Sequence, residues 1–282
     1  MKQYVLLLKC LDRPGIVHEI SGGLFQEGCN IEESAQFSES GTAVFYMRVR
    51  FSAPDRACVQ KIATALKRLY NGDEAGLAIH DMDKRSRVLI LVSKHGHCLN
   101  DLLFRQRSGL LNMDVAGVVS NHPDFRELAA SYDIPFHHFP VTPQTRAEQE
   151  GRILDLVAST QSDLVVLARY MQILSDRASN ALSGRAINIH HSFLPGFKGA
   201  RPYYQAYDRG VKLIGATAHY VTSELDEGPI IEQDVARVSH SLEPQALTDV
   251  GRDVECMTLA RAVKWHTEHR IILNGRKTIV FA

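Results

Sequence analysis

Short apolar runs that alternate with helical segments dominate the chain after residue 86. The apolar runs lie at 87–92, 115–119, 164–168 and 186–189, and helical segments such as 124–132 and 146–161 lie between them. Strands that are buried on both faces and separated by helices form mostly parallel sheets. We therefore expect a doubly wound α/β domain, and ligands of such sheets bind outside the carboxyl ends of the strands. A strand at 229–235, a helix at 243–266 and a terminal hairpin complete the prediction.

Residues 1–83 follow a different pattern. Strands are predicted at 4–9, 31–37, 45–51 and 77–82, with amphipathic helices after the first and third of them. This β-α-β-β-α-β order predicts a ferredoxin-like fold. Asp12 is expected to cap the first helix, and Gly28 is expected to end it.

The polar stretch 81–86 is the predicted boundary between two domains, 1–83 and 84–282. The chain carries 32 Lys plus Arg against 32 Asp plus Glu, so its charge gives no reason to expect nucleic acid or an anionic membrane as a partner. No apolar run approaches the length of a spanning helix. The five cysteines are odd in number and include no C-x-x-C pair, which favours a reducing cytoplasm over a disulfide framework.

Two sequence segments place three polar side chains in a fixed order. Asn188 and His190 lie two residues apart in a predicted strand, so they point to the same face. Asp226 follows His190 by 226 − 190 = 36 residues, at a turn before another apolar run. An amide stabilises a developing oxyanion, an imidazole moves protons near neutral pH, and a carboxylate fixes the tautomer of that imidazole. Together the three suit addition of a nucleophile to a carbonyl group.

Residues 188–195 read N-I-H-H-S-F-L-P, and residues 225–229 read L-D-E-G-P. They resemble the motifs of the formyltransferase family that uses 10-formyltetrahydrofolate, and the resemblance covers about residues 87–282. It implies that Asn188, His190 and Asp226 are catalytic. It also implies that 167–175 lines a slot for the pterin, which 221–226 closes. The residues expected to bind the substrate are Met171, Ile173, Leu174, Val221 and Glu224. The family resemblance implies no cofactor and no metal.

The N-terminal domain resembles the ACT domain, a regulatory module that often binds small ligands such as amino acids at dimer interfaces. The resemblance rests on the strand and helix order and on two segments, D-R-P-G at 12–15 and G-C-N-I at 28–31. It implies a homo-oligomer and a ligand niche near Asp12, Gly15, Asn30 and Ile31.

The loop after the first strand of the second domain bears on the identity of the formyl acceptor. Transferases of the family that act on glycinamide ribonucleotide carry a glycine-rich loop there, whose backbone cradles a phosphate. Here residues 93–98 read S-K-H-G-H-C, so an amine co-substrate loses its anchor and water remains as the acceptor. His191, where the transferases usually have proline, and the loop 197–203 also resemble the hydrolase branch.

With its ACT-like domain, the whole chain resembles the formyltetrahydrofolate deformylases, which hydrolyse 10-formyltetrahydrofolate to formate and tetrahydrofolate. The resemblance implies a cytoplasmic enzyme that balances one-carbon folate pools and supplies formate for purine synthesis. It implies folate and water as partners, with a small amino acid as effector.

Three alternatives remain. The chain could transfer the formyl group to an amine such as glycinamide ribonucleotide. It could be a metallohydrolase, because its 13 histidines include close pairs, but no third ligand follows at a recognised spacing such as H-E-x-x-H. It could also be a non-catalytic folate or amino-acid sensor, which the intact order of Asn188, His190 and Asp226 disfavours.

Overall fold

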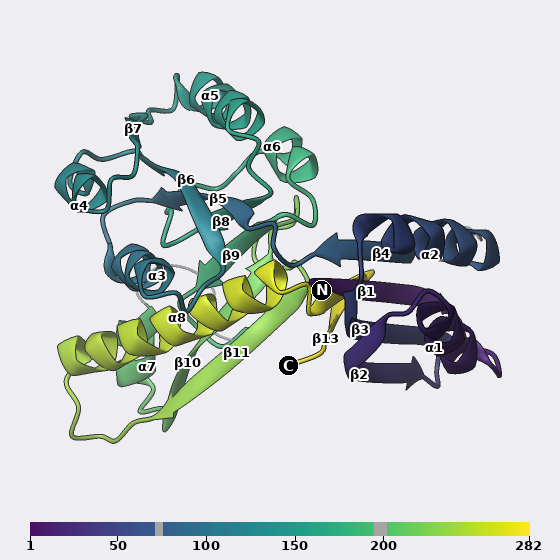
Figure 1. The fold of residues 1–282 in the computed structure, drawn as a ribbon. Helices are drawn as coiled ribbons and strands as arrows, with labels where there is room; N and C mark the ends of the chain where they lie inside the picture. The colour runs from purple at the N-terminus through teal and green to yellow at the C-terminus, as the bar shows by residue number, and fades with distance from the viewer. Residues whose placement is uncertain (71–75, 195–201) are drawn as a thin grey trace. The chain divides into compact units, whose positions relative to one another are not determined.

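The computed structural model describes residues 1–70, 76–194 and 202–282, which form two compact units (Figure 1). The first unit consists of Met1–Arg85, Glu268–Asn274 and Ile279–Ala282, and the second of Ser86–Thr267 and Gly275–Thr278. No helix in this part of the chain is long and apolar enough to cross a membrane.

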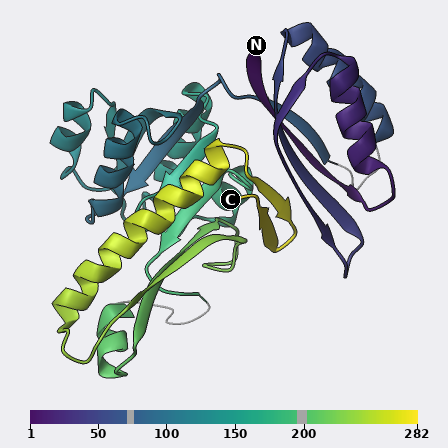
Figure 2. The same ribbon diagram turned by 60° about the horizontal axis from the view of Figure 1, so that its bottom comes forward.

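The first unit contains an antiparallel sheet with two helices on one face (Figure 2). Its main elements are β1 (Lys2–Leu11), α1 (Ile16–Gln26), β2 (Asn30–Glu39), β3 (Val44–Ala53), α2 (Arg56–Leu69) and β4 (Gly76–Asp81). The strand order β2-β3-β1-β4 confirms the predicted ferredoxin-like fold. Its core joins Leu6 and Phe51 of the sheet to Ile20 and Leu66 of the helices.

The C-terminal end of α1 was predicted correctly from the sequence, and its N-terminal cap was not. Gly28, at φ 70°, follows the helix and ends it as expected. The prediction that Asp12 caps the helix is wrong, because the N-cap is Gly15, at φ 94°. The backbone N–H of Asp12 donates to the carbonyl of Ala43 at 2.8 Å, and its carboxylate accepts a hydrogen bond from Ser38. These bonds hold Asp12 at the end of the β1–β3 ladder, too far before the helix to cap it.

The other face of this sheet is covered by the C-terminal segment of the chain. This segment contains a hairpin of β12 (Ile271–Asn274) and β13 (Lys277–Val280). Ile272 and Phe281 pack against Tyr46 of β3 in a separate hydrophobic cluster. The guanidinium of Arg48, also on β3, is almost completely buried and donates from Nη2 to the carbonyl of Glu268 at 3.2 Å. The N-terminal sheet is therefore a middle layer between its own helices and the C-terminal segment.

The second unit contains a sheet whose described strands follow the order β11-β10-β9-β8-β5-β6-β7. Strands β5 to β9 are mutually parallel, and β10 and β11 are antiparallel to their neighbours. The elements are β5 (Ser86–Val92), α3 (His97–Arg107), β6 (Met113–Ser120), α4 (Arg126–Ser131), β7 (Phe136–His138), α5 (Arg146–Ser159), β8 (Leu164–Leu167), α6 (Asp176–Ala181), β9 (Ala186–His190), α7 (Pro202–Asp208), β10 (Leu213–Tyr220), β11 (Ile230–Arg237) and α8 (Pro244–Thr267). This arrangement confirms the predicted doubly wound, mostly parallel sheet.

The order of the central strands creates a crevice. From β5 the chain proceeds to β6 and β7 on one side, and it then returns to β8 and β9 on the other side. The loops that follow β5 and β8 therefore leave their carboxyl ends in opposite directions, which opens a site for a ligand between them. Strand β9 ends nearby at His190, beside β8. Helix α8 crosses β9, β10 and β11 and packs against α3 (Figure 1).

Strand β10 was not predicted from the sequence. Its small residues, among them Gly215, Ala216 and Ala218, give little apolar signal. A side chain at Gly215 would approach the carbonyl oxygen of Asp234 to 2.6 Å, so close pairing with β11 requires a glycine here. Antiparallel pairing of β10 with β9 brings His219 opposite Asn188.

Candidate active site

A cavity of about 580 Å³ opens at the carboxyl ends of β5, β8 and β9. It is lined by Asn188, His190 and Asp226, which were predicted to act together. It is also lined by the five residues predicted to bind the substrate, Met171, Ile173, Leu174, Val221 and Glu224. Residues from three separate parts of the sequence thus face one space.

The side chains of His190 and Asp226 lie close enough to form an ion pair. His190 Nδ1 lies 3.3 Å from Asp226 Oδ2, and both side chains are largely buried. An ionised carboxylate only accepts hydrogen bonds, so in a neutral ring the proton resides on Nδ1 and Nε2 keeps its lone pair. Nε2 is buried and has no hydrogen-bond partner in the part of the chain that the structure describes. Such a nitrogen can take a proton from a molecule in the cavity.

The turn that carries Asp226 is unusually constrained. Asp226 has φ 57°, a left-handed conformation that is uncommon outside glycine. A side chain at Gly228 would come within 1.7 Å of the carbonyl oxygen of Tyr220, so the turn approaches β10 too closely for any other residue. Burial alone would raise the pKa of Asp226, but the hydrogen bond from His190 outweighs it and holds that pKa well below its usual range. The carboxylate is therefore ionised at neutral pH.

Asn188 contacts a histidine that the sequence analysis missed. Its Nδ2 lies 3.2 Å from His219 Nε2, and His219 Nδ1 lies 2.9 Å from the carbonyl oxygen of Tyr220. A carbonyl only accepts, so Nδ1 donates, and Nε2 of the neutral ring accepts from the Asn188 amide. His219 Nε2 also lies 3.7 Å from Asp226 Oδ1. One N–H of Asn188 is thereby oriented, and its second N–H has no partner among the described residues, so it can donate to a ligand.

Four of the five residues predicted to bind the substrate are apolar, and two of these four are exposed. Met171 and Ile173 are 54% and 55% exposed, so they do not belong to the hydrophobic core. Leu174 and Val221 are partly buried and pack against the core on the α5 face of the sheet. Glu224 is exposed and lies 3.4 Å from Arg276 Nη2. An apolar wall with exposed side chains suits a flat aromatic ligand.

The loop after β5 has little resemblance to a phosphate cradle. Ser93 Oγ donates to Asn121 Oδ1 at 2.7 Å and accepts from the backbone N–H of Met171 at 3.0 Å, so it fixes the slot segment. A side chain at Gly96 would come within 2.3 Å of the Phe125 ring, which explains this glycine by packing. Residues 195 and 197–201 of the predicted motifs lie outside the described residues.

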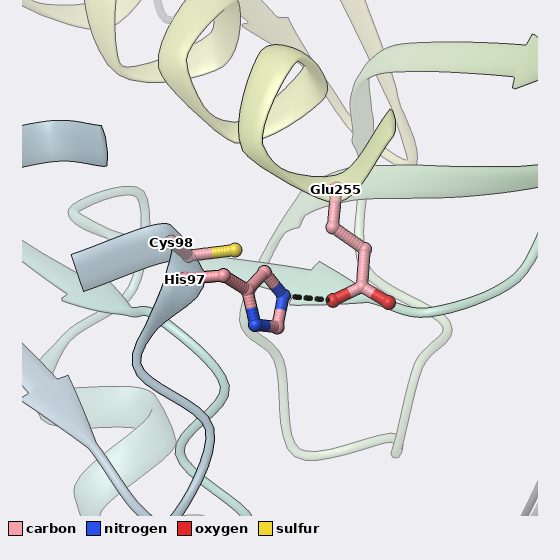
Figure 3. Close-up of side chains that lie close together, drawn as sticks. All are labelled: His97, Cys98 and Glu255. Carbon is pink, nitrogen blue, oxygen red and sulfur yellow. Dashed lines mark hydrogen bonds and ion pairs between the residues drawn. The ribbon is translucent and has the colours of Figure 1, made fainter. Parts of the chain in front are cut away.

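A second buried polar cluster lines the same cavity, and the sequence analysis did not identify it. Glu255 of α8 accepts from His97 Nε2 at 2.7 Å and from the Tyr203 hydroxyl at 2.6 Å. Arg169 Nε lies 3.3 Å from Glu255 Oε2. Figure 3 shows His97 and Glu255 pointing toward each other from α3 and α8. Burial opposes ionisation of Glu255, but the bonds from His97 and Tyr203 and the charge of Arg169 lower its pKa overall.

His97, Cys98 and Glu255 also form the one close group of potential metal ligands among the described residues (Figure 3). Their ligand atoms lie within 4.8 Å of one another. His97 and Glu255 already satisfy each other, however, and burial raises the pKa of the Cys98 thiol. Because a metal binds the thiolate, this donor set does not fit a metal ion. The absence of a catalytic metal remains a prediction.

The residues predicted to form a regulatory niche do not converge within one chain. Asp12 and Gly15 lie where β1 ends and α1 begins, and Asp12 is tied to Ser38 near the end of β2. Asn30 and Ile31 lie at the start of β2, at the opposite end of the same sheet.

Similarity to known proteins extends over the whole chain. Residues 86–263 match the family model described as formyl transferase. The chain is 47% identical to formyltetrahydrofolate deformylase from a Corynebacterium species, over 99% of this chain and 98% of that protein. The crystal structure of formyltetrahydrofolate deformylase from Burkholderia mallei is similar with a TM-score of 0.94 and 53% identity, over 100% of both chains.

A more distant relative covers only part of the chain. The crystal structure of a glycinamide ribonucleotide transformylase from Symbiobacterium toebii is similar with a TM-score of 0.67 and 29% identity. The matched region covers 73% of this chain and 98% of the transformylase chain. The chain therefore belongs to the formyltetrahydrofolate deformylase family.

Proposed function

We propose that this chain hydrolyses 10-formyltetrahydrofolate to formate and tetrahydrofolate. The observation that carries the proposal is the cavity in which a buried imidazole with a free Nε2, its carboxylate partner and an oriented amide face one apolar slot. Relatives at 47% identity that cover nearly the whole chain are named for this activity. No cofactor is needed, because water and a proton carrier suffice to hydrolyse a formyl amide.

The chemical steps follow from the geometry of the three polar side chains. The pterin docks against Met171 and Ile173, which brings the formyl group on N10 of the folate next to Asn188. Nε2 of His190 takes a proton from water as the water oxygen attacks the formyl carbon. The free N–H of Asn188 donates to the oxyanion of the tetrahedral intermediate, and Asp226 stabilises the imidazolium of His190.

The intermediate then collapses as the bond between carbon and N10 breaks. N10 must gain a proton to leave as the amine, and this proton comes from the His190 imidazolium or through a water molecule held by Asp226. Formate and tetrahydrofolate are the products, and the imidazole returns to its neutral form. In the cell, the formate released would enter purine synthesis, and the reaction would balance the one-carbon folate pools of the cytoplasm.

The decisive experiment measures two products from 10-formyltetrahydrofolate. We expect formate release that does not depend on any amine, and no formylated nucleotide when glycinamide ribonucleotide is added. Ser93–Cys98 supports this expectation, because its single glycine serves to pack against Phe125. Saturable transfer to glycinamide ribonucleotide, faster than formate release, would refute the hydrolase assignment in favour of a transferase.

We further propose that residues 1–83 form an ACT-like regulatory domain that assembles the homo-oligomer, with catalysis in residues 84–282. Strand β2 is at the edge of its sheet, and its Phe37 is 45% exposed, which invites pairing with a second copy. Antiparallel pairing of two β2 edges would bring Asp12 and Gly15 of one copy toward Asn30 and Ile31 of the other. A small amino acid could then bind between the copies.

The oligomeric state of a β2 variant tests this assembly. Phe37→Asp should dissociate the oligomer and abolish any response of formate release to added amino acids. An unchanged mass in solution and an unchanged effector response would contradict the proposed role.

A further inference from the structure

We propose that His97, Tyr203 and Arg169 restrict the formyl acceptor to water by saturating the buried carboxylate of Glu255. These four residues are called the acceptor-side cluster below. The inference rests on the proposed function, since it assigns the specificity of that same cavity. It makes His97 a specificity-determining residue.

The acceptor-side cluster lines the same cavity as the proposed catalytic residues. His191 marks its position, because the His191 ring makes an edge contact with the His190 ring at 5.1 Å between centroids. The charges of Arg169 and Glu255 act on the same His191 ring. All four residues of the cluster line the cavity together with His190 and Asp226. A nucleophile that approaches the formyl carbon near His190 therefore shares the cavity with Glu255.

The chemistry of a buried carboxylate explains the proposed restriction. An unpaired carboxylate in a cavity would bind an incoming amine strongly, through charge-assisted hydrogen bonds. In this chain the Tyr203 hydroxyl donates to Oε1 of Glu255 and His97 Nε2 donates to Oε2. Arg169 Nε lies 3.3 Å from Oε2 as an ion pair, without a hydrogen bond among the described residues. An amine would have to displace one of these partners and leave it buried without a hydrogen bond, which is costly. Water needs no such anchor, because its small size lets it reach the formyl carbon without being oriented by the wall.

The fold supports two partners of Glu255, Tyr203 and His97, with specific packing features. The Tyr203 ring lies so close to α8 that a side chain at Gly251 would meet it at 2.2 Å. His97 is the first residue of α3, directly after Gly96, whose contact with Phe125 fixes the start of that helix. Glu255 itself is 1% exposed, so its partners exclude solvent from it. The cluster is therefore built into the packing of three separate segments.

The test measures how the formyl group is partitioned between water and an amine. The purified full-length enzyme is given 10-formyltetrahydrofolate and glycinamide, and both formate and N-formylglycinamide are quantified. In the transfer reaction the amine nitrogen bonds to the formyl carbon, the bond to N10 breaks, and the amine proton passes to N10. We expect His97→Ala to raise the ratio of N-formylglycinamide to formate by about tenfold or more, because Glu255 Oε2 then loses its hydrogen-bond donor and can accept from the amine.

The matched control is His95→Ala. His95 also lines the cavity but has no hydrogen bond to Glu255 among those of the described residues, so its loss widens the cavity without freeing the carboxylate. The ratio should stay near the wild-type value in this control. The double variant His97→Ala with Glu255→Gln should lose the increase, because an amide holds an amine more weakly than a carboxylate does.

Tyr203→Phe provides a second route if His97→Ala does not fold. It removes only the hydroxyl that binds Oε1, so a smaller rise in the ratio is expected. An unchanged ratio in folded His97→Ala, or an equal rise in His95→Ala, would overturn the inference while hydrolysis by the wild type stands. Absence of formate release from the wild type would instead overturn the proposed function and the inference with it.

Discussion

Asp226 combines a backbone conformation that side chains disfavour with a carboxylate that is held ionised. Its φ of 57° costs conformational energy, and such strain persists where the surroundings determine the geometry. The close approach of Gly228 to β10 supplies that constraint, and it aims the carboxylate at His190 and His219. The hydrogen bond from His190 also offsets the effect of burial on the pKa of Asp226. We therefore infer that the strained turn positions the Asp226 carboxylate so that it orients the imidazole of His190, the proposed general base.

Substitution of the three proposed catalytic residues should separate their roles. Asn188→Ala should reduce turnover by roughly 10²–10³ through loss of the oxyanion donor. His190→Ala should reduce it by roughly 10²–10⁴ through loss of the proton carrier. Asp226→Asn should cut turnover while folate binding stays close to normal. Steady-state kinetics and folate titration of each variant test this, and near-normal turnover in any folded variant would show that its assigned role is wrong.

His219 should act as a positioning residue for Asn188. His219→Ala removes the acceptor that orients the amide, so kcat should fall by about tenfold or more with little change in KM. His219→Gln keeps an acceptor near the same position and should recover part of the loss. Steady-state kinetics of both variants provide the measurement. If KM rises and kcat is unchanged, His219 contributes to substrate binding instead.

His191 should make the stability of the fold depend on pH. Burial, followed by the charges of Arg169 and His190, lowers the pKa of His191 to about 3. The unfolded ring takes up a proton below about pH 6.5, whereas the folded ring stays neutral until much lower pH. The unfolded state thus binds more protons in this window, and the free energy of unfolding falls as the pH decreases from about 6.5 toward 3.

His191→Asn should reduce the change in the free energy of unfolding with pH. For a single proton this change is at most about 1.4 kcal/mol per pH unit. Urea unfolding between about pH 5 and 7 measures it. His240→Asn, at an exposed histidine outside the cavity, should keep the wild-type slope. Equal slopes in wild type and His191→Asn would contradict the prediction.

At the scale of elements, the turn between β10 and β11 has no room for a side chain at Gly228. Gly228→Ala places a methyl group 1.7 Å from a backbone oxygen, so the turn must move and Asp226 must move with it. We expect a loss of about 1–3 kcal/mol in the free energy of unfolding together with a loss of turnover. Gly151→Ala in α5 meets nothing within 4 Å and should stabilise the protein by about 0.5–1 kcal/mol. Thermal unfolding and activity assays of the two alanine variants test this prediction. Equal stability and equal turnover in the two variants would contradict it.

The elements that the sequence predicted well are those with a strong local pattern. The apolar runs of β5, β8 and β9 and the long amphipathic α8 appear where they were expected, because their periodicity and length leave few alternatives. Strand β10 was not predicted because its small residues give little apolar signal. Close contact with β11 requires a glycine at position 215, and that contact is not visible in the sequence. Met171 and Ile173 were placed in the slot only through family resemblance, since their apolar character alone would have suggested core packing.

The same distinction applies to the proposed site. Asn188 and His190 could be predicted to share a face because they alternate on one strand. His219 could not be predicted, because its contact with Asn188 depends on the register of β9 and β10. A signal existed in the alternation of Thr217 and His219 along β10, but without a recognised strand it had no meaning. The pairing of His97 with Glu255 depends on the packing of α3 against α8, which no local pattern encodes.

At the scale of the whole molecule, the chain returns at its end to the unit in which it began. The N-terminal sheet has its helices on one face and the C-terminal segment on the other. Arg48 is 1% exposed and donates to the carbonyls of His269 and Glu268. A buried guanidinium without these acceptors would be strongly destabilising. Residues 268–269 therefore contribute to the folded state of the first unit, together with Glu33, which also pairs with Arg48.

Substitutions within β12 should test this dependence. Ile272 is 9% exposed and packs against the face of β3 that carries Tyr46, so Ile272→Ala should lower the free energy of unfolding by about 2 kcal/mol or more. Leu273 is the next residue on the same strand but is 38% exposed, so Leu273→Ala should change it by no more than about 0.5 kcal/mol. Amide hydrogen exchange in β3 should accelerate only in the Ile272 variant, because the covering segment opens more often. Equal exchange in both variants would mean that the C-terminal segment rests on the sheet without stabilising it.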